Sequence, residues 1–364
     1  ALGFVTIGER DAYGNLVKFI EKLPNKDSTT TYTYDAVRHP IRLTDTLWNI
    51  RTWSYDWFGR LANASDIHAS GDASYGVRSY FYDTLGRVAQ YINATWERTN
   101  YTYDAISRIK TEQIGPGITR LYSYDAWTRS LGTLSTVVDS GSTVSYGYDS
   151  LGRKILENRT IGDTTYSLDY TYNITNTLTS IIYPDSGKTE YQYKNGYVEW
   201  VIYTNPLGIK TEIVSDISYA PNTRMKSLRY GDGVVKNTER DAGYNHRLTR
   251  STVTSADNTK LLDTEYNYDA TSNINRIVEW GIDPLRKNID YTYDPLSRLT
   301  WANYRYAVAW YGRNQSRNLS YTYDDIGNIT NASNIGTYAY AWVGYANPHA
   351  VTSAGWMNYT YDEA

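Results

Sequence analysis

The dipeptide Tyr-Asp recurs along the whole chain of 364 residues, mostly at intervals of about 21 to 30, usually with a second aromatic residue two positions before the Tyr. Self-similarity at a regular spacing indicates one supersecondary unit stacked many times, each unit contacting mainly its neighbours. The clear copies of the pair are Tyr34-Asp35, Tyr82-Asp83, Tyr103-Asp104, Tyr124-Asp125, Tyr148-Asp149, Tyr268-Asp269, Tyr293-Asp294, Tyr323-Asp324 and Tyr361-Asp362. We therefore expect a single continuous array over residues 1–364, with about fourteen repeats that become degenerate from residue 337.

Each copy has the residue pattern of a β-strand. In Tyr101-Thr102-Tyr103 the two rings are two residues apart, so both lie on one face of a strand and Thr lies on the other. Tyr and Thr are strand formers, so propensity and periodicity agree. The chain has 39 Tyr and only 4 Phe, which indicates a half-solvated aromatic wall rather than an apolar core.

The residues after each Tyr-Asp pair predict a hairpin turn. Asp can accept a hydrogen bond from the backbone two residues on, and a Gly three residues later supplies the positive φ of a turn with a one-residue bulge. Gly86-Arg87 and Gly152-Arg153 follow this pattern. Ser replaces the Gly at 107, 272 and 297, where we expect a different closure. A second kind of turn is expected between the copies, as in Tyr183–Gly187 and Tyr230–Gly233.

Each repeat is therefore predicted to be two antiparallel strands with one turn at each edge of the sheet. About fourteen repeats give about 28 strands, and open sheets of more than about ten strands curl, split or close. The expected fold class is all-β, with repetitive antiparallel hairpins that spiral into a hollow barrel, shell or tube.

These residues resemble the YD-repeat, or Rhs-repeat, family across essentially the whole chain. Tyr82-Asp83-Thr84-Leu85-Gly86-Arg87 and Tyr148-Asp149-Ser150-Leu151-Gly152-Arg153 match its motif, and residues 347–362 are similar to the stretch that precedes the end of the shell in Rhs toxins. The resemblance implies a long sheet that spirals into a hollow shell. In Rhs toxins and insecticidal toxin complexes such a shell encloses a C-terminal toxin, and in teneurins a related barrel serves adhesion. The self-cleaving core and the toxin domain of that pattern have no counterpart within residues 1–364.

The sequence contains little that indicates catalysis or a cofactor. It has no Cys, and its four His residues, His39, His68, His246 and His349, are too far apart in sequence for a zinc motif. The recurring Asp residues follow the turns, which favours capping over the alternative, calcium binding. The Trp residues occupy no single repeat position, which favours wall packing over sugar binding. We therefore expect no catalytic residue, cofactor or metal site, and no enzyme.

Charge and hydropathy exclude two kinds of partner. A net charge of −3 with interspersed acidic and basic residues gives no basic track for nucleic acid. The chain has no apolar run of about 18 residues, so no transmembrane segment is expected.

The acceptor motif Asn-x-Ser/Thr is the second recurring pattern. Its copies begin at Asn63, Asn93, Asn100, Asn158, Asn173, Asn314, Asn318, Asn328, Asn331 and Asn358. One interpretation is that Asn, Ser and Thr simply suit strands and turns. The other is N-glycosylation of an extracellular or cell-surface protein, which would keep a Tyr-rich wall soluble.

Two functions remain in competition, both structural. The preferred hypothesis is a secreted or cell-surface wall subunit that associates with copies of itself, or with adjoining parts of a longer precursor, through open sheet edges to form an extracellular filament or sheath. The alternative is a shell fragment of an Rhs-type toxin that encapsulates and delivers a polypeptide cargo.

Overall fold

The computed structural model describes residues 5–22, 26–72, 75–126, 131–243, 246–280, 286–308, 313–340 and 347–361. These residues form 31 β-strands and no helix. The expected all-β class with repetitive hairpins is confirmed, with a few more strands than the estimate from the repeats. Asp362, the last of the predicted turn residues, lies outside the described residues.

The strands follow one another with short turns. The first sixteen are β1 (Thr6–Arg10), β2 (Leu16–Lys22), β3 (Asp27–Tyr34), β4 (Pro40–Thr44), β5 (Ile50–Tyr55), β6 (Leu61–Ser65), β7 (Val77–Tyr82), β8 (Val88–Ile92), β9 (Arg98–Tyr103), β10 (Ile109–Ile114), β11 (Ile118–Tyr124), β12 (Leu134–Val138), β13 (Ser142–Tyr148), β14 (Lys154–Ile161), β15 (Thr164–Tyr172) and β16 (Leu178–Ile182). The others are β17 (Lys188–Lys194), β18 (Tyr197–Thr204), β19 (Lys210–Tyr219), β20 (Met225–Tyr230), β21 (Val235–Arg240), β22 (Leu248–Thr254), β23 (Lys260–Tyr268), β24 (Ile274–Trp280), β25 (Arg286–Tyr293), β26 (Leu299–Val308), β27 (Arg313–Tyr323), β28 (Ile329–Ala332), β29 (Gly336–Tyr340), β30 (Val351–Ala354) and β31 (Met357–Asn358).

The sheet is an uninterrupted antiparallel meander. Each strand pairs with the next one in sequence, from β1 with β2 to β30 with β31. Most hairpins that follow a Tyr-Asp pair carry a register shift at the Tyr, for example at Tyr103 in the β9–β10 pair and at Tyr148 in the β13–β14 pair. The described strands β1 and β31 are not paired with each other, so the sheet is open at both ends.

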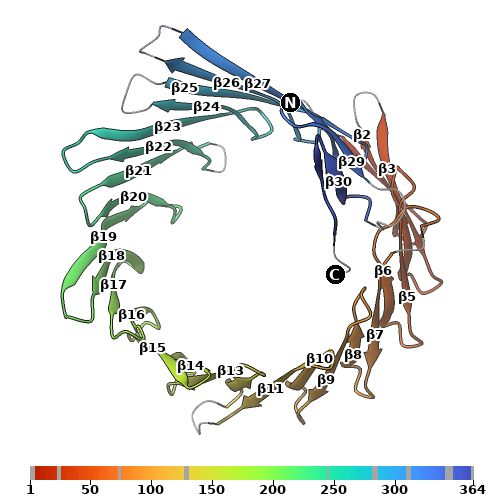
Figure 1. Ribbon diagram of the computed structural model, residues 1–364, viewed down its shortest axis with the longest axis horizontal. Helices are drawn as coiled ribbons and strands as arrows, with labels where there is room; N and C mark the ends of the chain where they lie inside the picture. The colour runs from red at the N-terminus through yellow and green to blue at the C-terminus, as the bar shows by residue number, and fades with distance from the viewer. Residues whose placement is uncertain are drawn as a thin grey trace.

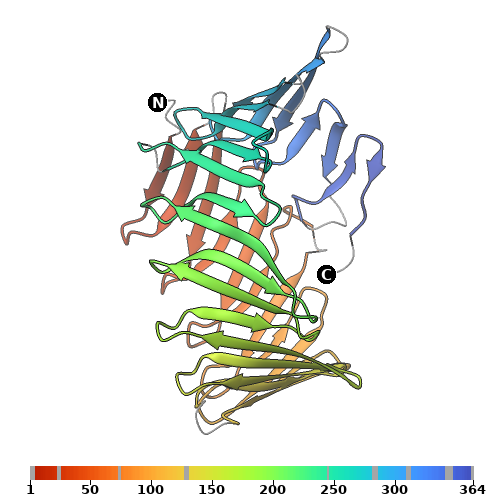
Figure 2. The same ribbon diagram turned by 90° about the vertical axis from the view of Figure 1, so that its left-hand side faces the viewer.

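The sheet is a single layer that winds once around a central axis (Figure 1). In the perpendicular view, the last strands are displaced along that axis from the first strands, so the winding is a spiral rather than a flat ring (Figure 2). The two ends meet side by side near the start of β3. There Lys26 forms an ion pair with Asp325, and Ser28 Oγ donates to the Asp325 carbonyl at 3.1 Å. We call this contact the seam.

The turns form two rims of the winding. The YD rim contains the turns that join each odd-numbered strand to the following even-numbered strand, and every Tyr-Asp turn among the described residues lies there. The opposite rim contains the turns that join each even-numbered strand to the following odd-numbered strand.

A wall one layer thick buries few large side chains. Its most buried apolar residues include Ala302, Ala332 and Ala354, each at most 1% exposed, and Val278 at 4%. The Tyr residues of the repeats are half-buried, and the intervening residue, such as Thr102, is exposed. Thr102 in turn makes a hydroxyl contact of 2.6 Å with Thr111 across the hairpin. The wall is therefore held by aromatic contacts and polar ladders more than by a central core.

Candidate functional site at the Tyr-Asp turns

The turn after Tyr148 shows the closure of one repeat. The Asp149 N–H donates to the Arg153 carbonyl at 3.0 Å, and the Gly152 N–H donates to the Asp149 carbonyl at 3.0 Å. Gly152 has a φ of 74°. This is a three-residue hairpin loop in which a type I turn ends on a left-handed residue. It is the geometry that the sequence predicts for this motif.

The carboxylate of Asp149 organises the same turn. Its Oδ1 accepts from the backbone N–H groups of Leu151 at 2.9 Å and Arg153 at 3.0 Å, and its Oδ2 accepts from Arg153 Nε at 2.6 Å. The same two backbone bonds to Oδ1 are made by Asp35, Asp83, Asp104, Asp269, Asp294 and Asp324. These Asp side chains are therefore turn caps, in agreement with the spacing argument.

The turns with Ser in place of Gly close in the same way, so the expectation of a different closure is wrong. Ser107, Ser272 and Ser297 have φ values of 70°, 72° and 59°, and each donates its N–H to the carbonyl of the turn Asp at 2.9–3.1 Å. Each Ser hydroxyl also accepts a bond from the preceding repeat, for example from Arg87 Nη1 to Ser107 Oγ at 3.1 Å. This bond offsets part of the strain of a left-handed non-Gly residue.

The second kind of turn differs in its cap and not in its backbone. At the opposite rim the Tyr183 N–H donates to the Gly187 carbonyl at 2.8 Å and the Ser186 N–H to the Tyr183 carbonyl at 2.9 Å, with Ser186 at a φ of 69°. Asp185 accepts from the Gly187 N–H at 2.9 Å. This turn thus uses the same backbone closure as the Tyr-Asp turns.

The Tyr before each Asp joins its repeat to the one before. Tyr103 at the end of β9 donates its hydroxyl to the Val88 carbonyl at the start of β8, at 2.7 Å. Equivalent bonds of 2.7–2.9 Å are made by Tyr34, Tyr82, Tyr148, Tyr268, Tyr293 and Tyr323. Because these rings are half-buried, the hydroxyl bond and the ring contact act together.

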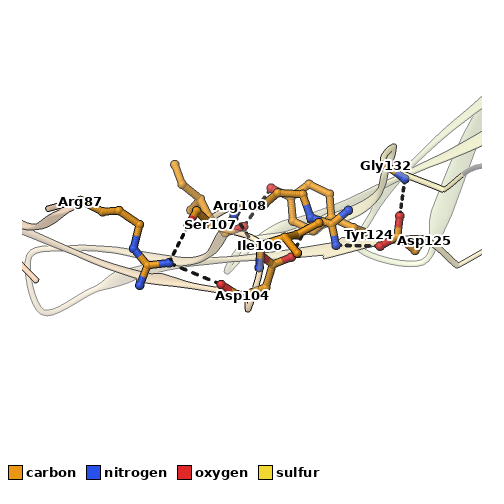
Figure 3. A network of polar contacts seen from close by, with 9 residues as sticks. Arg87, Asp104, Ile106, Ser107, Arg108, Tyr124, Asp125 and Gly132 are labelled. Atoms are coloured by element: carbon orange, nitrogen blue, oxygen red, sulfur yellow. Dashed lines mark hydrogen bonds and ion pairs between the residues drawn. The ribbon is translucent and has the colours of Figure 1, made fainter. Parts of the chain in front are cut away.

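In the turns that end in Arg, the Arg side chain reaches forward to the next repeat. The guanidinium of Arg87 lies 4.4 Å from the ring centre of Tyr103, and that of Arg108 lies 4.2 Å from that of Tyr124. Arg108 Nη2 also donates to Asp125 Oδ2 at 2.6 Å, and Arg87 Nη1 contacts the Asp104 carbonyl at 3.5 Å. Figure 3 shows Arg87 reaching the turn of Asp104 and Ser107, and Arg108 reaching Tyr124 and Asp125.

We call this arrangement the inter-repeat clasp: the turn Asp holds the Arg, and the Arg packs on the Tyr of the next repeat. It was not predicted from the sequence. The signal was present, because an Arg follows four residues after Asp83, Asp104, Asp149 and Asp294. The ring partner of each Arg, however, is a Tyr 16 to 25 residues further along the chain.

The clasp environment favours the ionised form of its Asp and the neutral form of its Tyr. The side-chain hydrogen bond from Arg87 holds the pKa of Asp83 below its ordinary value, and the backbone N–H of Arg108 does the same for the pKa of Asp104. Burial raises the pKa of Tyr103. These carboxylates therefore stay charged at neutral pH, and the clasp Tyr stays neutral.

Three of the four histidines have structural side-chain partners. His39 Nδ1 lies 3.1 Å from Asp35 Oδ2 in a turn, His68 stacks on Tyr75 with ring centres 3.7 Å apart, and His349 Nδ1 lies 2.7 Å from Asn328 Oδ1. The described part of the chain contains no group of three or more His, Asp or Glu side chains arranged to hold a metal ion. It also contains no helix with the length and hydropathy needed to cross a membrane.

Several of the acceptor asparagines have a role in turns. The side-chain oxygens of Asn93 and Asn173 cap their turns and also accept from the Thr hydroxyl two residues later, at 2.8 Å in both cases. Asn328 is 8% exposed, and its amide donates to Asp324 and to the Pro348 carbonyl. Of the other candidates, Asn63, Asn318 and Asn358 are exposed and Asn100, Asn158 and Asn331 are partly buried; the side chain of Asn314 lies outside the described part.

Comparison with solved structures identifies the fold. The chain superposes on the TcdB2-TccC3 complex with a TM-score of 0.78 at 18% sequence identity, covering 90% of this chain and 19% of that chain. A complex described as TcdB2-TccC3-Cdc42 gives the same values. A Photorhabdus luminescens Tc holotoxin pore with a mutated TccC3 gives a TM-score of 0.76 at 18% identity, covering 90% of this chain and 18% of that chain.

The resemblance to YD-repeat proteins is thereby confirmed at the level of the fold: the chain has the winding wall of these toxin shells. It spans about a fifth of the length of the solved chains that it matches. No protein-family model matches the chain, and no curated protein matches it.

Proposed function

We propose that this chain is a non-enzymatic wall segment of a hollow YD-repeat shell that acts outside the cell and encloses a polypeptide cargo. The observation that carries the proposal is the match of 90% of the chain to the winding wall of TcdB2-TccC3 at a TM-score of 0.78. The seam supports it, because a second winding already begins beside the first within residues 26–28 and 324–328.

The chemistry of the turns fits a wall. In the turns that end in Arg, the clasp uses the charged side chains to hold the next repeat, as Arg87 does with Asp83, the Asp104 carbonyl and Ser107. A shell needs register and curvature that stay constant along the sheet, and a contact repeated from turn to turn supplies both.

The proposal can be tested with a disordered tracer peptide fused after residue 364. Protease digestion of the fusion should proceed more slowly than digestion of the same tracer on a fusion in which Arg87, Arg108 and Arg153 are changed to Ala to weaken the clasp. Equal rates for the two fusions, with the wall itself folded, would contradict the proposal.

A second candidate is a subunit of an extracellular filament or sheath. The observation that favours it is the open sheet, because the described edge strands β1 and β31 each have only one partner strand and a free strand edge can pair with another chain. Electron microscopy separates the two candidates: rings, single or stacked rim to rim, support the shell, and polymers joined through the sheet edges β1 and β31 support the filament.

A further inference from the structure

A row of exposed apolar side chains follows the YD rim through its first seven turns. Each member immediately precedes the left-handed residue of its turn. The members are Tyr13, Val37, Phe58, Leu85, Ile106, Leu131 and Leu151, and each is 69–80% exposed. Single exposed apolar residues are ordinary, but one turn position that is apolar in seven consecutive turns is a regular feature of the rim. We call it the apolar row.

The row stops after the seventh turn. The same position is polar in later turns, at Thr175, Asn222 and Thr271, and the β17–β18 turn has only two residues, Asn195 and Gly196, and lacks the position. It is apolar again in the last two Tyr-Asp turns of the described part, at Leu296 and Ile326, where the side chains are partly buried. This turn position is therefore exposed in the first part of the winding and covered in the last.

The seam shows which surface a covered turn lies against. Asp325, the neighbour of Ile326 on the YD rim, contacts Lys26 and Ser28 at the start of β3, which is on the opposite rim. Ser28 is only 7% exposed. The spiral thus places the YD rim of a later winding on the opposite rim of the earlier one, as the axial displacement in Figure 2 requires.

The opposite rim carries exposed apolar side chains of its own. Trp48 is 74% exposed, Trp96 80%, Leu207 84% and Trp356 88%. Trp48 and Trp96 have φ values of 66°, which turn their side chains out at the tips of the β4–β5 and β8–β9 turns. The chain therefore displays both halves of a rim-to-rim contact, on its two opposite sides.

We propose that the apolar row docks on the opposite rim of a second copy of this chain, which continues the spiral by head-to-tail stacking. The partner is a second copy because, at the seam, the opposite rim of this chain already contacts one of its own Tyr-Asp turns. The contact is heterologous, so it repeats from copy to copy instead of closing a pair. The inference deepens the proposed wall function, since it states how successive windings join.

Sedimentation velocity of the purified chain over a concentration series tests the stacking. The average mass should rise with concentration through more than two copies. A variant with Phe58→Asp, Leu85→Asp and Ile106→Asp should associate about tenfold or more weakly, because it places charge in the row. The matched control changes Thr175, Asn222 and Thr271 on the same rim to Asp and should associate within about twofold of the parent chain. A chain that stays monomeric, or a control that is weakened equally, overturns the proposal.

Orientation is tested by cross-linking, since the chain has no native Cys. With a short bis-maleimide, a mixture of Leu85→Cys and Trp96→Cys chains should give mixed dimers in excess of either homodimer. An excess of Leu85→Cys homodimers would indicate a symmetric contact and overturn head-to-tail stacking. These tests of stacking are independent of the test of the wall function. If stacking is absent, protection of the tracer peptide by the single chain is unchanged. If the tracer is not protected, the sedimentation result is unchanged.

Discussion

Ser107 offers a direct test of how the Tyr-Asp turns balance strain against contact. Its backbone is left-handed with a φ of 70°, a conformation that Gly adopts freely and other residues adopt at a cost of about 1–2 kcal/mol. Its hydroxyl accepts a 3.1 Å bond from Arg87 Nη1 of the preceding repeat. Two substitutions separate these effects, because Ser107→Ala removes only the bond and Ser107→Gly removes the bond and the strain.

The expected free energies follow from these two contributions. A hydrogen bond at a solvent-exposed turn contributes about 0.5–1.5 kcal/mol, so Ser107→Ala should lower the free energy of unfolding by about 1 kcal/mol. Ser107→Gly loses the same bond but recovers about 1–2 kcal/mol of backbone strain, so it should be neutral or stabilising. The free energy of unfolding of the Ser107→Gly variant should therefore exceed that of the Ser107→Ala variant by about 1 kcal/mol or more.

The matched control is Gly86→Ala in the preceding turn. Gly86 has a φ of 81°, and an added Cβ would lie 3.5 Å from Arg60 Nη1, an ordinary contact. This variant should lose about 1 kcal/mol from backbone strain alone. Urea unfolding followed by Trp fluorescence gives the midpoints, and hydrogen exchange at the turn amides shows whether the change is local. The reasoning is refuted if Ser107→Gly is as unstable as Ser107→Ala.

Three further predictions concern the clasp, a buried carboxylate and the acceptor motifs. Tyr103→Phe keeps the ring under Arg87 but leaves the Val88 carbonyl without its 2.7 Å bond, so it should cost about 1 kcal/mol in urea unfolding, and no loss would contradict a clasp role for the hydroxyl. Asp263 is 1% exposed, and its bonds from Arg250 lower its pKa to about 2, below its ordinary value of 3.8. Because the folded pKa is the lower one, its stabilisation of roughly 2–3 kcal/mol is present above about pH 4 and lost on acidification toward pH 2, and an Asp263→Asn variant should show a flatter acid-unfolding profile. If the protein is glycosylated, intact mass and peptide mapping should place glycans at exposed Asn63 and Asn318 rather than at buried Asn328, and a mass equal to that of the bare sequence would remove the glycosylation hypothesis.

The parts of the fold that depend on nearby residues were predictable from the sequence. The alternation of Tyr and Thr gives the strands, and Asp149 with Gly152 gives the turn, because every bond involved spans no more than four residues. The Ser turns were misjudged because propensity disfavours a left-handed Ser. A hydrogen bond from Arg87 to Ser107 offsets the backbone strain of this Ser. The two residues are 20 positions apart, so the bond forms only when the repeats are stacked.

The seam and the apolar row needed the structure. The contact between Lys26 and Asp325 joins residues 299 positions apart, so it depends on the accumulated curvature of all the strands between them. No local sequence pattern determines this accumulated curvature. The apolar position in the turns was visible in the sequence, but only the winding shows that it is covered at one end of the chain and exposed at the other.

The strict pairing of each strand with its sequence neighbours has a mechanical consequence. The two termini belong to the two free edges of the sheet, so a force that pulls them apart loads the outermost hairpin first and breaks its hydrogen bonds one after another. A force across the wall, in contrast, meets many clasps in parallel. The chain should thus peel apart from its ends at low force while it resists lateral stretching, as optical-tweezer pulling in the two geometries would show.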